Sequence, residues 1–560
     1  MTPRLLDLDA VDRLRALALR FGPGHAERKS EALAACAAGG IADPAALVAY
    51  HDCLLCLLAY PESRALRRAA QAELRRVAAA ARRIMEDGPA RARKKLAHSG
   101  IAWTDVTIGF GWDVARWLVR RFPTHADIDS FGDGGVAVQS VAADALAPME
   151  FELAASDEDP CAFIDSARAG RRGTRLAWLV GAFERMRCSD AVRDTLFDAL
   201  HAYIVVRPRD SILSRTFVRG LAAPAYFHHD GLARSVDLGA LVDEARPAPR
   251  QLTASERAHV VDAGRAMLAA LGRETDAIAL AYPEGVAWHE VGRGIAIALY
   301  TMRPDRRSPL DSHVGMMLFK NGVPVGYGGG WPFLGTCRIG VNIFAPFRGG
   351  ESALLFGQVL RAYRQRFGVG RFVAEPSQFG GTNKEGLQSG AFWFYYRLGF
   401  RPIERRSARL AGEEWARMEA DPGYRTPIPA LRRFAGSDIE LRLEDVPECE
   451  TASLSDAVTG WIRERCDGDR TAAEADAERI VARALGPLHR DRWPEAERHA
   501  FRALAPLFAQ IPGLGRWPAS DRRALVALMR AKGGDEFRFH DLAARHRRLR
   551  GALTALAAAK

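Results

Sequence analysis

Cysteine is scarce in this sequence, with eight residues spread over 560 positions. So sparse a distribution excludes the disulfide framework that stabilises small secreted domains. One cluster, His51-Asp52-Cys53 with Cys56, has side chains that zinc accepts, but no second Cys-x-x-Cys pair or histidine pair lies nearby to complete four ligands. We therefore expect no metal, and we expect these cysteines to be small core residues of an apolar helix.

Long apolar runs are also missing. No stretch approaches the roughly 20 apolar residues that a membrane-spanning helix needs. The first residues, MTPRLLDLDAVDRLRALALRF, carry charges among their apolar side chains and lack the apolar region of a signal peptide. These absences predict a cytoplasmic protein that does not enter the membrane. The length and the globular proportions of aliphatic and aromatic residues predict about two to four domains with buried cores.

The most informative stretch begins at Val341. Val341, Ile343 and Ala345 alternate as on a half-buried strand, and helical apolar spacing begins at Leu354. Between them lies the turn Phe347-Arg348-Gly349-Gly350. A glycine-rich turn that opens a helix gathers unpaired backbone N–H groups at the positive end of the helix dipole. The pattern therefore predicts a site for an anion, of which phosphate is the most common.

A second pattern, SGAFWFYYRLGFRP, follows from Ser389 to Pro402. Its aromatic residues predict a core helix with Gly399 as its C-cap. Its spacing also matches the motif A-x-x-x-Y-x-x-x-G-F at Ala391, Tyr395, Gly399 and Phe400.

Together the two patterns resemble the GNAT superfamily of N-acyltransferases, which bind acetyl-CoA or another acyl-CoA. In that family the strand ends in a pattern like V-x-P-x-Y-R-G-x-G-x-G/A. Ile343 takes its first position here, and Phe347-Arg348-Gly349 takes the Y-R-G. Without a gap, Glu351 and Ala353 occupy the next two small positions; with a one-residue deletion, Gly350 and Ser352 do. The resemblance covers about residues 255–410.

The resemblance implies roles for these residues. Ile343 and the turn from Phe347 to Ala353 would bind acyl-CoA, and the backbone N–H groups of Arg348 to Ala353 would hold its pyrophosphate. Tyr395 would protonate the departing CoA thiolate, although a purely structural core role is the alternative. Glu351 stands at the mouth of this site, where its carboxylate either opposes a pyrophosphate or only favours the helix dipole.

The group that deprotonates the amine is less evident. Many family members place a Glu on the strand before the glycine turn, but this strand carries Arg338 and Asn342 and no acid. Glu375, at the end of the next strand, is the nearest replacement, because it falls where the central strands of the family separate. The alternative is an ordinary loop carboxylate. Residues 383–385 are expected in a polar loop that either touches substrate or is only solvated.

The preceding residues predict strands in the order of the family. His313–Lys320 is one strand, and Asn321-Gly322 is a hairpin turn because both positions must accept φ > 0. The return strand begins at Val323 and is expected to loosen at residues 328–330. A third strand is expected from about Cys337 to the glycine turn.

The first 250 residues predict mainly helices: Leu5–Arg20, Ala45–Leu58, Ser63–Glu86, Asp113–Arg121 and Ala191–Val205. A basic stretch runs from Arg64 to Lys95 in a chain of net charge +11. We favour a solvated helix face for this charge, and a nucleic acid or another polyanion is the alternative partner. No motif indicates sequence-specific recognition.

Pro247, Pro249 and Arg250 mark an expected linker. The sequence thus predicts three regions: 1–250 mainly helical, 251–410 a GNAT-like α/β domain with a mixed sheet and flanking helices, and 411–560 mainly helical. The predicted reaction transfers an acyl group, acetyl above all, from acyl-CoA to an amine of a small molecule or a protein. Two alternatives stay open: a degenerate GNAT fold that only binds or regulates, and an aminoacyl-tRNA-dependent transferase, which shares the fold.

Overall fold

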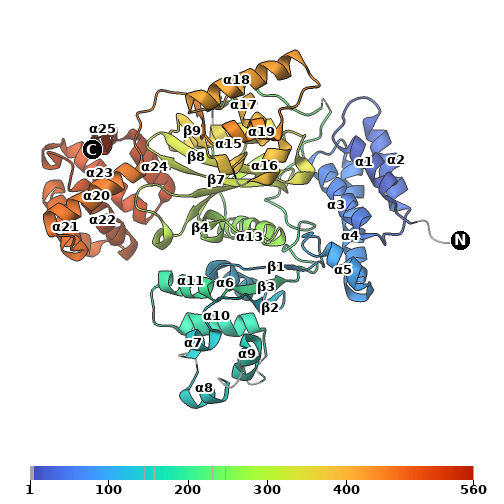
Figure 1. The fold of residues 1–560 in the computed structure, drawn as a ribbon, viewed down its shortest axis with the longest axis horizontal. Coiled ribbons are helices and arrows are strands. Elements are labelled where there is room, and N and C mark those ends of the chain that lie inside the picture. The colour runs from blue at the N-terminus through green and yellow to red at the C-terminus, as the bar shows by residue number, and fades with distance from the viewer. Residues whose placement is uncertain are drawn as a thin grey trace. The chain divides into compact units, whose positions relative to one another are not determined.

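The computed structural model describes residues 5–143, 146–154, 159–168, 170, 172–229, 231–245, 248–381 and 383–558 (Figure 1). The chain forms two compact units that interleave along the sequence. Unit 1 comprises Met1–Leu232, Thr253–Ala279 and Phe319–Val325, and unit 2 comprises Ala233–Leu252, Leu280–Leu318 and Gly326–Lys560. The predicted region 251–410 therefore contributes to both units. Pro247, in the expected linker, lies outside the described residues.

Unit 1 begins with five helices: α1 (Leu8–Ala18), α2 (His25–Ala37), α3 (Pro44–Ala59), α4 (Arg64–Asp87) and α5 (Ala90–Leu96). Three of them begin where the side chain of Asp7, Asp43 or Ser63 accepts a hydrogen bond from a backbone N–H of the first turn. Helix α3 is buried on almost all sides, which explains its continuous apolar sequence.

The rest of unit 1 surrounds a three-stranded antiparallel sheet of order β1-β3-β2. The strands are β1 (Val106–Ile108), β2 (Ala126–Phe131) and β3 (Ala202–Val206). Its helices are α6 (Trp112–Arg121), α7 (Val138–Ala142), α8 (Pro148–Ala154), α9 (Pro160–Arg168), α10 (Arg175–Arg185), α11 (Asp190–Ala199), α13 (Ala254–Ala270) and α14 (Asp276–Ala279).

One predicted helix of unit 1 is wrong in its second half. We expected a helix over Ala191–Val205, but α11 ends at Ala199 and the chain continues as β3. His201 adopts φ 49°, which interrupts the helix. The following Ile204, Val205 and Val206 have β-branched side chains that favour a strand.

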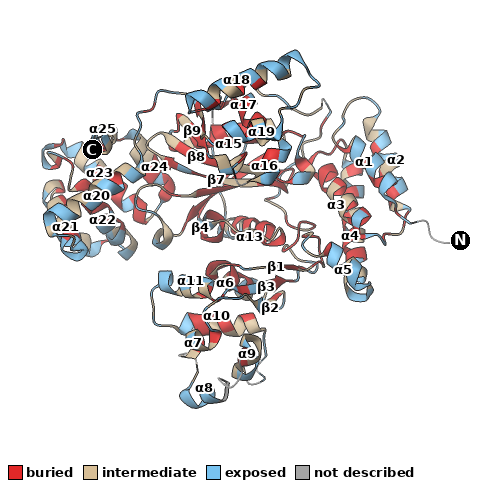
Figure 2. Cartoon of the chain, in the orientation of Figure 1, coloured by how far each residue is buried: buried red, intermediate tan, exposed pale blue. Residues whose placement is uncertain are grey.

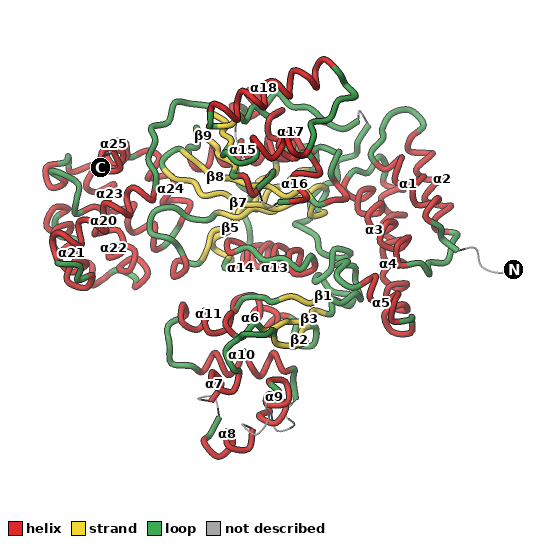
Figure 3. Tube along the Cα trace, in the orientation of Figure 1, coloured by secondary structure: helices red, strands yellow, loops and turns green. Residues whose placement is uncertain are grey.

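An eight-stranded mixed sheet has the order β10-β11-β9-β8-β7-β6-β5-β4. Figure 3 labels β5, β7, β8 and β9 of this sheet and draws its strands in yellow. Its strands are β4 (Ala281–Glu290), β5 (Ile295–Met302), β6 (Val314–Lys320), β7 (Val323–Phe333), β8 (Thr336–Ile343), β9 (Arg371–Ala374), β10 (Arg401–Pro402) and β11 (Ile439–Arg442). Strands β8 and β9 are parallel, whereas β7 is antiparallel to β8 and β11 is antiparallel to β9. The expectation of an α/β chain with a mixed sheet and flanking helices is confirmed at this level.

Strands β8 and β9 are paired at only one end of β8. Its register runs from Thr336 opposite Arg371 to Arg338 opposite Val373. Strand β9 then ends at Ala374, whereas β8 continues to Ile343 while paired with β7. The last residues of β8 are thereby left without a neighbouring strand on the β9 side, within the described part of the chain.

The glycines of β7 do not loosen the strand, contrary to the expectation. Strand β7 runs through Gly328, Gly329 and Gly330 to Phe333. A Cβ atom on Gly328 would lie 2.1 Å from the carbonyl oxygen of Gly340, and one on Gly329 would lie 2.3 Å from the ring of His313. Glycine is present here because neighbouring atoms approach the backbone too closely for any side chain.

The remaining helices of unit 2 are α12 (Leu238–Asp243), α15 (Ser352–Phe367), α16 (Lys384–Ser389), α17 (Ala391–Arg397), α18 (Arg405–Ala420) and α19 (Ile428–Phe434). In Figure 1, α15, α16, α17 and α19 lie close together beside β8 and β9. Phe356 of α15 packs against Tyr395 and Phe400, with ring centroids 5.5 and 6.2 Å apart. This aromatic cluster fixes α15 and α17 side by side.

The C-terminal helices form a bundle: α20 (Thr451–Cys466), α21 (Arg470–Leu485), α22 (Glu495–Phe508), α23 (Ala519–Gly533), α24 (Glu536–Arg545) and α25 (Arg547–Ala558). Val481, Phe501 and Leu525 lie in its core and are fully buried. Figure 2 shows buried residues on the inner sides of these helices and exposed residues on their outer sides. Across the residues that the structure describes, every helix is too short or too polar to cross a membrane.

Candidate functional site

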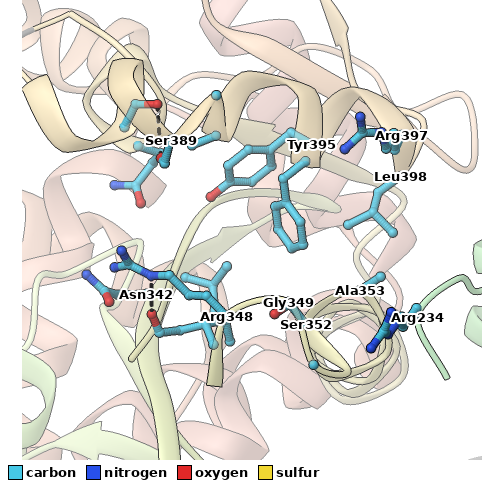
Figure 4. A pocket seen from close by; sticks show the side chains of 18 of the residues that line it. Arg234, Asn342, Arg348, Gly349, Ser352, Ala353, Ser389, Tyr395, Arg397 and Leu398 are labelled. Carbon is cyan, nitrogen blue, oxygen red and sulfur yellow. Dashed lines mark hydrogen bonds between the residues drawn. The ribbon is translucent and has the colours of Figure 1, made fainter. Parts of the chain in front are cut away.

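A cavity of about 570 Å³ lies in unit 2, beside the end of β8 that β9 leaves unpaired (Figure 4). Val341, Asn342 and Ile343 line it from β8. The other lining residues come from residues 234–236, the turn before α15, the first turn of α15, Gln378, and helices α16 and α17 with the residues next to them. The two motifs found in the sequence therefore meet at one cavity.

The start of α15 leaves backbone N–H groups unpaired beside this cavity, whereas in the preceding turn the N–H groups of Arg348 and Gly350 donate to the carbonyls of Ala345 and Phe347. Gly349 has φ 80°, a conformation that glycine adopts without strain, and it lines the cavity with Gly350, Ser352 and Ala353. No side chain caps α15, and its first intrahelical bond runs from the Leu355 N–H to the Glu351 carbonyl. The N–H groups of the first turn are thus outside the helical ladder, at the positive end of the helix dipole.

Three arginines add positive charge to the cavity. Arg234, Arg348 and Arg397 line it, and Glu385 is the single carboxylate among the described lining residues. Arg348 donates from Nε to the Ile343 carbonyl over 2.9 Å and also pairs with Glu385. Because cations outnumber carboxylates, the cavity suits an anion rather than a cation.

The carboxylate of Glu351 is buried outside the cavity. Its side chain is 0% exposed and does not line the cavity. It accepts hydrogen bonds from Arg293 Nη2 at 2.6 Å and from the backbone N–H of Ala233 at 3.1 Å. The carboxylate therefore neither opposes an anion in the cavity nor caps α15, and its charge is balanced by Arg293.

Tyr395 reaches the cavity from α17. Its side chain is 2% exposed, and its hydroxyl group points into the cavity (Figure 4). The hydroxyl makes no hydrogen bond of good geometry among the described residues, although the backbone of Val341 interacts weakly with it. Burial raises the pKa of Tyr395 above its ordinary value, and the backbone of Val341 offsets only part of that shift. The phenol therefore stays protonated at neutral pH and can donate a hydrogen bond to a group in the cavity.

Two other predicted site residues lie away from the cavity. Glu375 forms an ion pair with Arg338, with Oε1 2.9 Å from Nη1, and both side chains are about half exposed. Phe347 is buried below the turn, at 1% exposure. Neither residue lines the cavity. Ile343, in contrast, lies in its wall.

The expected loop at residues 383–385 is the start of a helix instead. Asn383 is the N-cap of α16, and its side chain accepts a hydrogen bond of 2.8 Å from the Gly386 N–H. Asparagine is among the best N-cap residues, which explains why the helix begins here despite the nearby glycines. Asn383 and Glu385 both line the cavity.

Sequence reasoning missed the wall formed by Arg234, Ser235 and Val236, and it missed Gln378. Residues 234–236 precede the predicted acyltransferase region and carry no motif. Gln378 lies over β8, where a Cβ on Gly340 would be 2.2 Å from its side-chain oxygen. A glycine in mid-strand at position 340 is the one signal of that close approach.

The described residues hold no group of three potential ligands that could bind a metal ion. Cys53 and Cys56 lie in the core on α3, where burial raises the pKa of Cys53 to about 12. A thiol that stays protonated is a poor metal ligand.

Comparison with models of protein families, with curated proteins and with solved structures found no match for this chain.

Proposed function

We propose that the protein is a GNAT-type acyltransferase that moves an acyl group, acetyl above all, from acyl-CoA to an amine. One observation carries this proposal: a single cavity combines the uncapped N-terminus of α15 with the buried hydroxyl of Tyr395, which points into it. The parallel strands that separate beside the cavity also support it, because the resemblance predicts such a separation at the acyl site.

The cavity fits the chemistry of acyl-CoA. Backbone N–H groups of Ser352 and Ala353 would hold the pyrophosphate, assisted by Arg348. The volume of about 570 Å³ lies within the range typical of small-molecule sites. The apolar side chains of Val341 and Ile343 would pack against the uncharged arm that carries the thioester.

In the proposed reaction, the amine attacks the thioester carbon, a C–N bond forms, and the C–S bond breaks as the thiolate leaves. Tyr395 would give its proton to that thiolate, because the phenol is protonated at neutral pH and its hydroxyl points into the cavity. Burial raises the pKa of Tyr395 and makes it a weaker acid, so the transfer depends on the negative charge that develops on sulfur. The amine proton needs another acceptor. We keep Glu375 as this acceptor. Because its carboxylate does not line the cavity, it would take the proton through a water molecule.

The anion site can be tested by one pair of variants. Ala353 lies in the first turn of α15 and lines the cavity. Ala353→Asp introduces a negative charge beside the bound pyrophosphate while remaining favourable for the helix dipole. Ala353→Asn has almost the same shape and no charge. We expect calorimetry to show acetyl-CoA binding to the wild type, retention in Ala353→Asn and a loss of at least tenfold in Ala353→Asp. Equal binding by both variants would place the pyrophosphate elsewhere.

A binding or regulatory module is the second candidate, and the position of Glu375 outside the cavity favours it. Such a module would bind acyl-CoA without turnover. Release of free CoA thiol in the presence of a panel of amines distinguishes the two, because only the enzyme releases it faster than spontaneous hydrolysis.

A further inference from the structure

The positive charge of the chain is concentrated on α4 and α5. From Arg64 to Lys95 the sequence holds eleven Arg or Lys residues and three acidic residues, a net charge of +8. The whole chain has a net charge of +11. One segment of unit 1 therefore carries most of the excess charge of the protein.

Most of these cations are not used inside the molecule. Arg67 donates to the Asn321 carbonyl, Arg76 pairs with Glu73, and Arg82 pairs with Glu86. The other eight are exposed and have no ion-pair or hydrogen-bond partner in the part of the chain that the structure describes: Arg64, Arg68, Arg75, Arg83, Arg91, Arg93, Lys94 and Lys95. We call the exposed surface of α4 and α5 that carries them the basic face.

Four arginines form a row along this face. Arg64, Arg68, Arg75 and Arg82 are spaced by four, seven and seven residues, which places them within about 40° of one another around an ideal helix. At 1.5 Å per residue the row spans about 27 Å. Arg82 also stacks on Trp103, with its guanidinium carbon 4.5 Å from the ring centroid.

The apolar side of α4 is already occupied. Leu66, Leu74 and Val77 point away from the row and are buried in unit 1. The exposed positions between the arginines are Ala65, Ala69, Gln71, Ala72 and Ala79. The basic face thus offers charge without large apolar side chains, whereas helices that bind to membranes insert such side chains among the lipids.

We propose that the basic face binds the phosphate backbone of a nucleic acid without reading its sequence. A row of arginines, of which Arg64, Arg68 and Arg75 are unpaired in the described structure, matches a linear polyanion; a DNA duplex carries about one charge per 1.7 Å of its axis. Each phosphate that an arginine neutralises releases condensed counterions, and this release drives the association. This activity is separate from acyl transfer, because none of the residues involved lines the cavity of unit 2.

The test uses fluorescence anisotropy with the full chain, a folded RNA of tRNA size and a DNA duplex of similar length, from 50 to 200 mM salt. We expect the logarithm of the association constant to fall linearly with the logarithm of salt concentration, with a slope of about −0.9 per phosphate contact on a duplex. Tighter binding to one of the two identifies RNA or DNA as the natural partner. Equal binding means that only the phosphate backbone is recognised.

The variant Arg64→Gln/Arg68→Gln/Arg75→Gln removes three unpaired charges and should weaken binding at least tenfold at 50 mM salt. The matched control is Arg523→Gln/Arg545→Gln/Arg547→Gln, which removes three exposed and unpaired charges from the described C-terminal bundle. We expect the control to bind as the wild type does. Thermal unfolding of both variants checks that they are folded.

Three results would overturn the proposal: no binding at 50 mM salt, an equal loss in both variants, or binding that ignores salt. Vesicles with a third of anionic lipid are the remaining arm. Binding to them, with none to RNA or DNA, would assign the basic face to a lipid surface instead.

Discussion

Glu351 and Arg293 form an ion pair whose carboxylate is completely enclosed by the protein, with Oε1 2.6 Å from Nη2. Glu351 immediately follows the glycine turn, Arg293 lies between β4 and β5, and Ala233 adds a backbone hydrogen bond. The ion pair and the hydrogen bond from Ala233 thus join, at the start of α15, three segments that are far apart in the sequence. One of them continues into Arg234, Ser235 and Val236, which form a wall of the cavity.

Glu351→Gln should therefore destabilise unit 2 and weaken acyl-CoA binding together. Breaking a fully buried pair costs about 3–5 kcal/mol, and a loss of about 1–3 kcal/mol is expected here because Arg293 keeps some contact with water. Urea unfolding and calorimetry measure the two effects. Glu385→Gln, in the exposed pair with Arg348, is the control and should cost less than about 1 kcal/mol. A Glu351→Gln protein of wild-type stability would contradict a holding role for this pair.

Tyr395→Phe removes a hydroxyl that makes no hydrogen bond of good geometry in the described structure. We expect the free energy of unfolding to be nearly unchanged, because only a weak interaction with the backbone of Val341 is lost. Turnover should fall by on the order of 100-fold or more if the hydroxyl protonates the thiolate. Stopped-flow detection of the CoA thiol measures this. Phe392→Leu, at a buried residue of the same helix, controls for packing, since it should lower stability and leave the chemical step intact. Unchanged turnover in Tyr395→Phe would remove Tyr395 from the mechanism.

Glu536 is expected to be one of the most sensitive positions of unit 2. It is buried with Lys532, whose Nζ is 2.8 Å away, and with Arg307, 3.3 Å away, and it also accepts a hydrogen bond from Ser312. Glu536→Gln leaves two buried cations facing one neutral amide and should cost about 3–5 kcal/mol. Differential scanning calorimetry measures the loss. Glu497→Gln, which breaks a pair with the more exposed Arg530, should cost less than about 1 kcal/mol.

Glu274 should make the stability of unit 1 depend on pH. Burial raises the pKa of Glu274 from 4.5 to about 7, with Asp198, Asp276 and Asp113 adding to the shift and the Gly111 N–H opposing it. Because the folded chain holds this proton more tightly than the unfolded chain, its stabilising contribution is complete below about pH 4.5. It is lost as the pH rises through about 7.

The variant Glu274→Gln imitates the protonated acid and still accepts the hydrogen bond from Gly111. We expect it to be more stable than the wild type at pH 8 and nearly equal at pH 4.5. Denaturant unfolding at several pH values makes the comparison, and parallel curves for the two proteins would exclude Glu274 as the source.

The elements around the cavity could be predicted because each has a local cause. The alternation before Phe347, the glycine turn and the aromatic spacing around Tyr395 are features of short windows, and the strand, turn and helix were found there. The neutralisation of Glu351 could not be predicted, because its partners Arg293 and Ala233 lie 58 and 118 positions away. The position of Arg234 could not be predicted either, because only the chain topology brings it to the cavity.

Misjudged elements show the same limit. Val205 and its neighbours are compatible with a helix by periodicity, and pairing with β1 and β2 decides for a strand. Asn383 looked like a loop residue because of the glycines around it, whereas its side chain begins a helix.

The glycines of β7 and β8 have a consequence for how the two strands find their alignment. Gly329 lies opposite Gly340, with Gly328 and Gly330 on either side. A shift along the pair would carry a side chain of one strand into the space that now accepts none, at Gly340 or His313. The register of β7 and β8 is therefore set by steric exclusion of side chains at these glycines, rather than by favourable contacts between side chains.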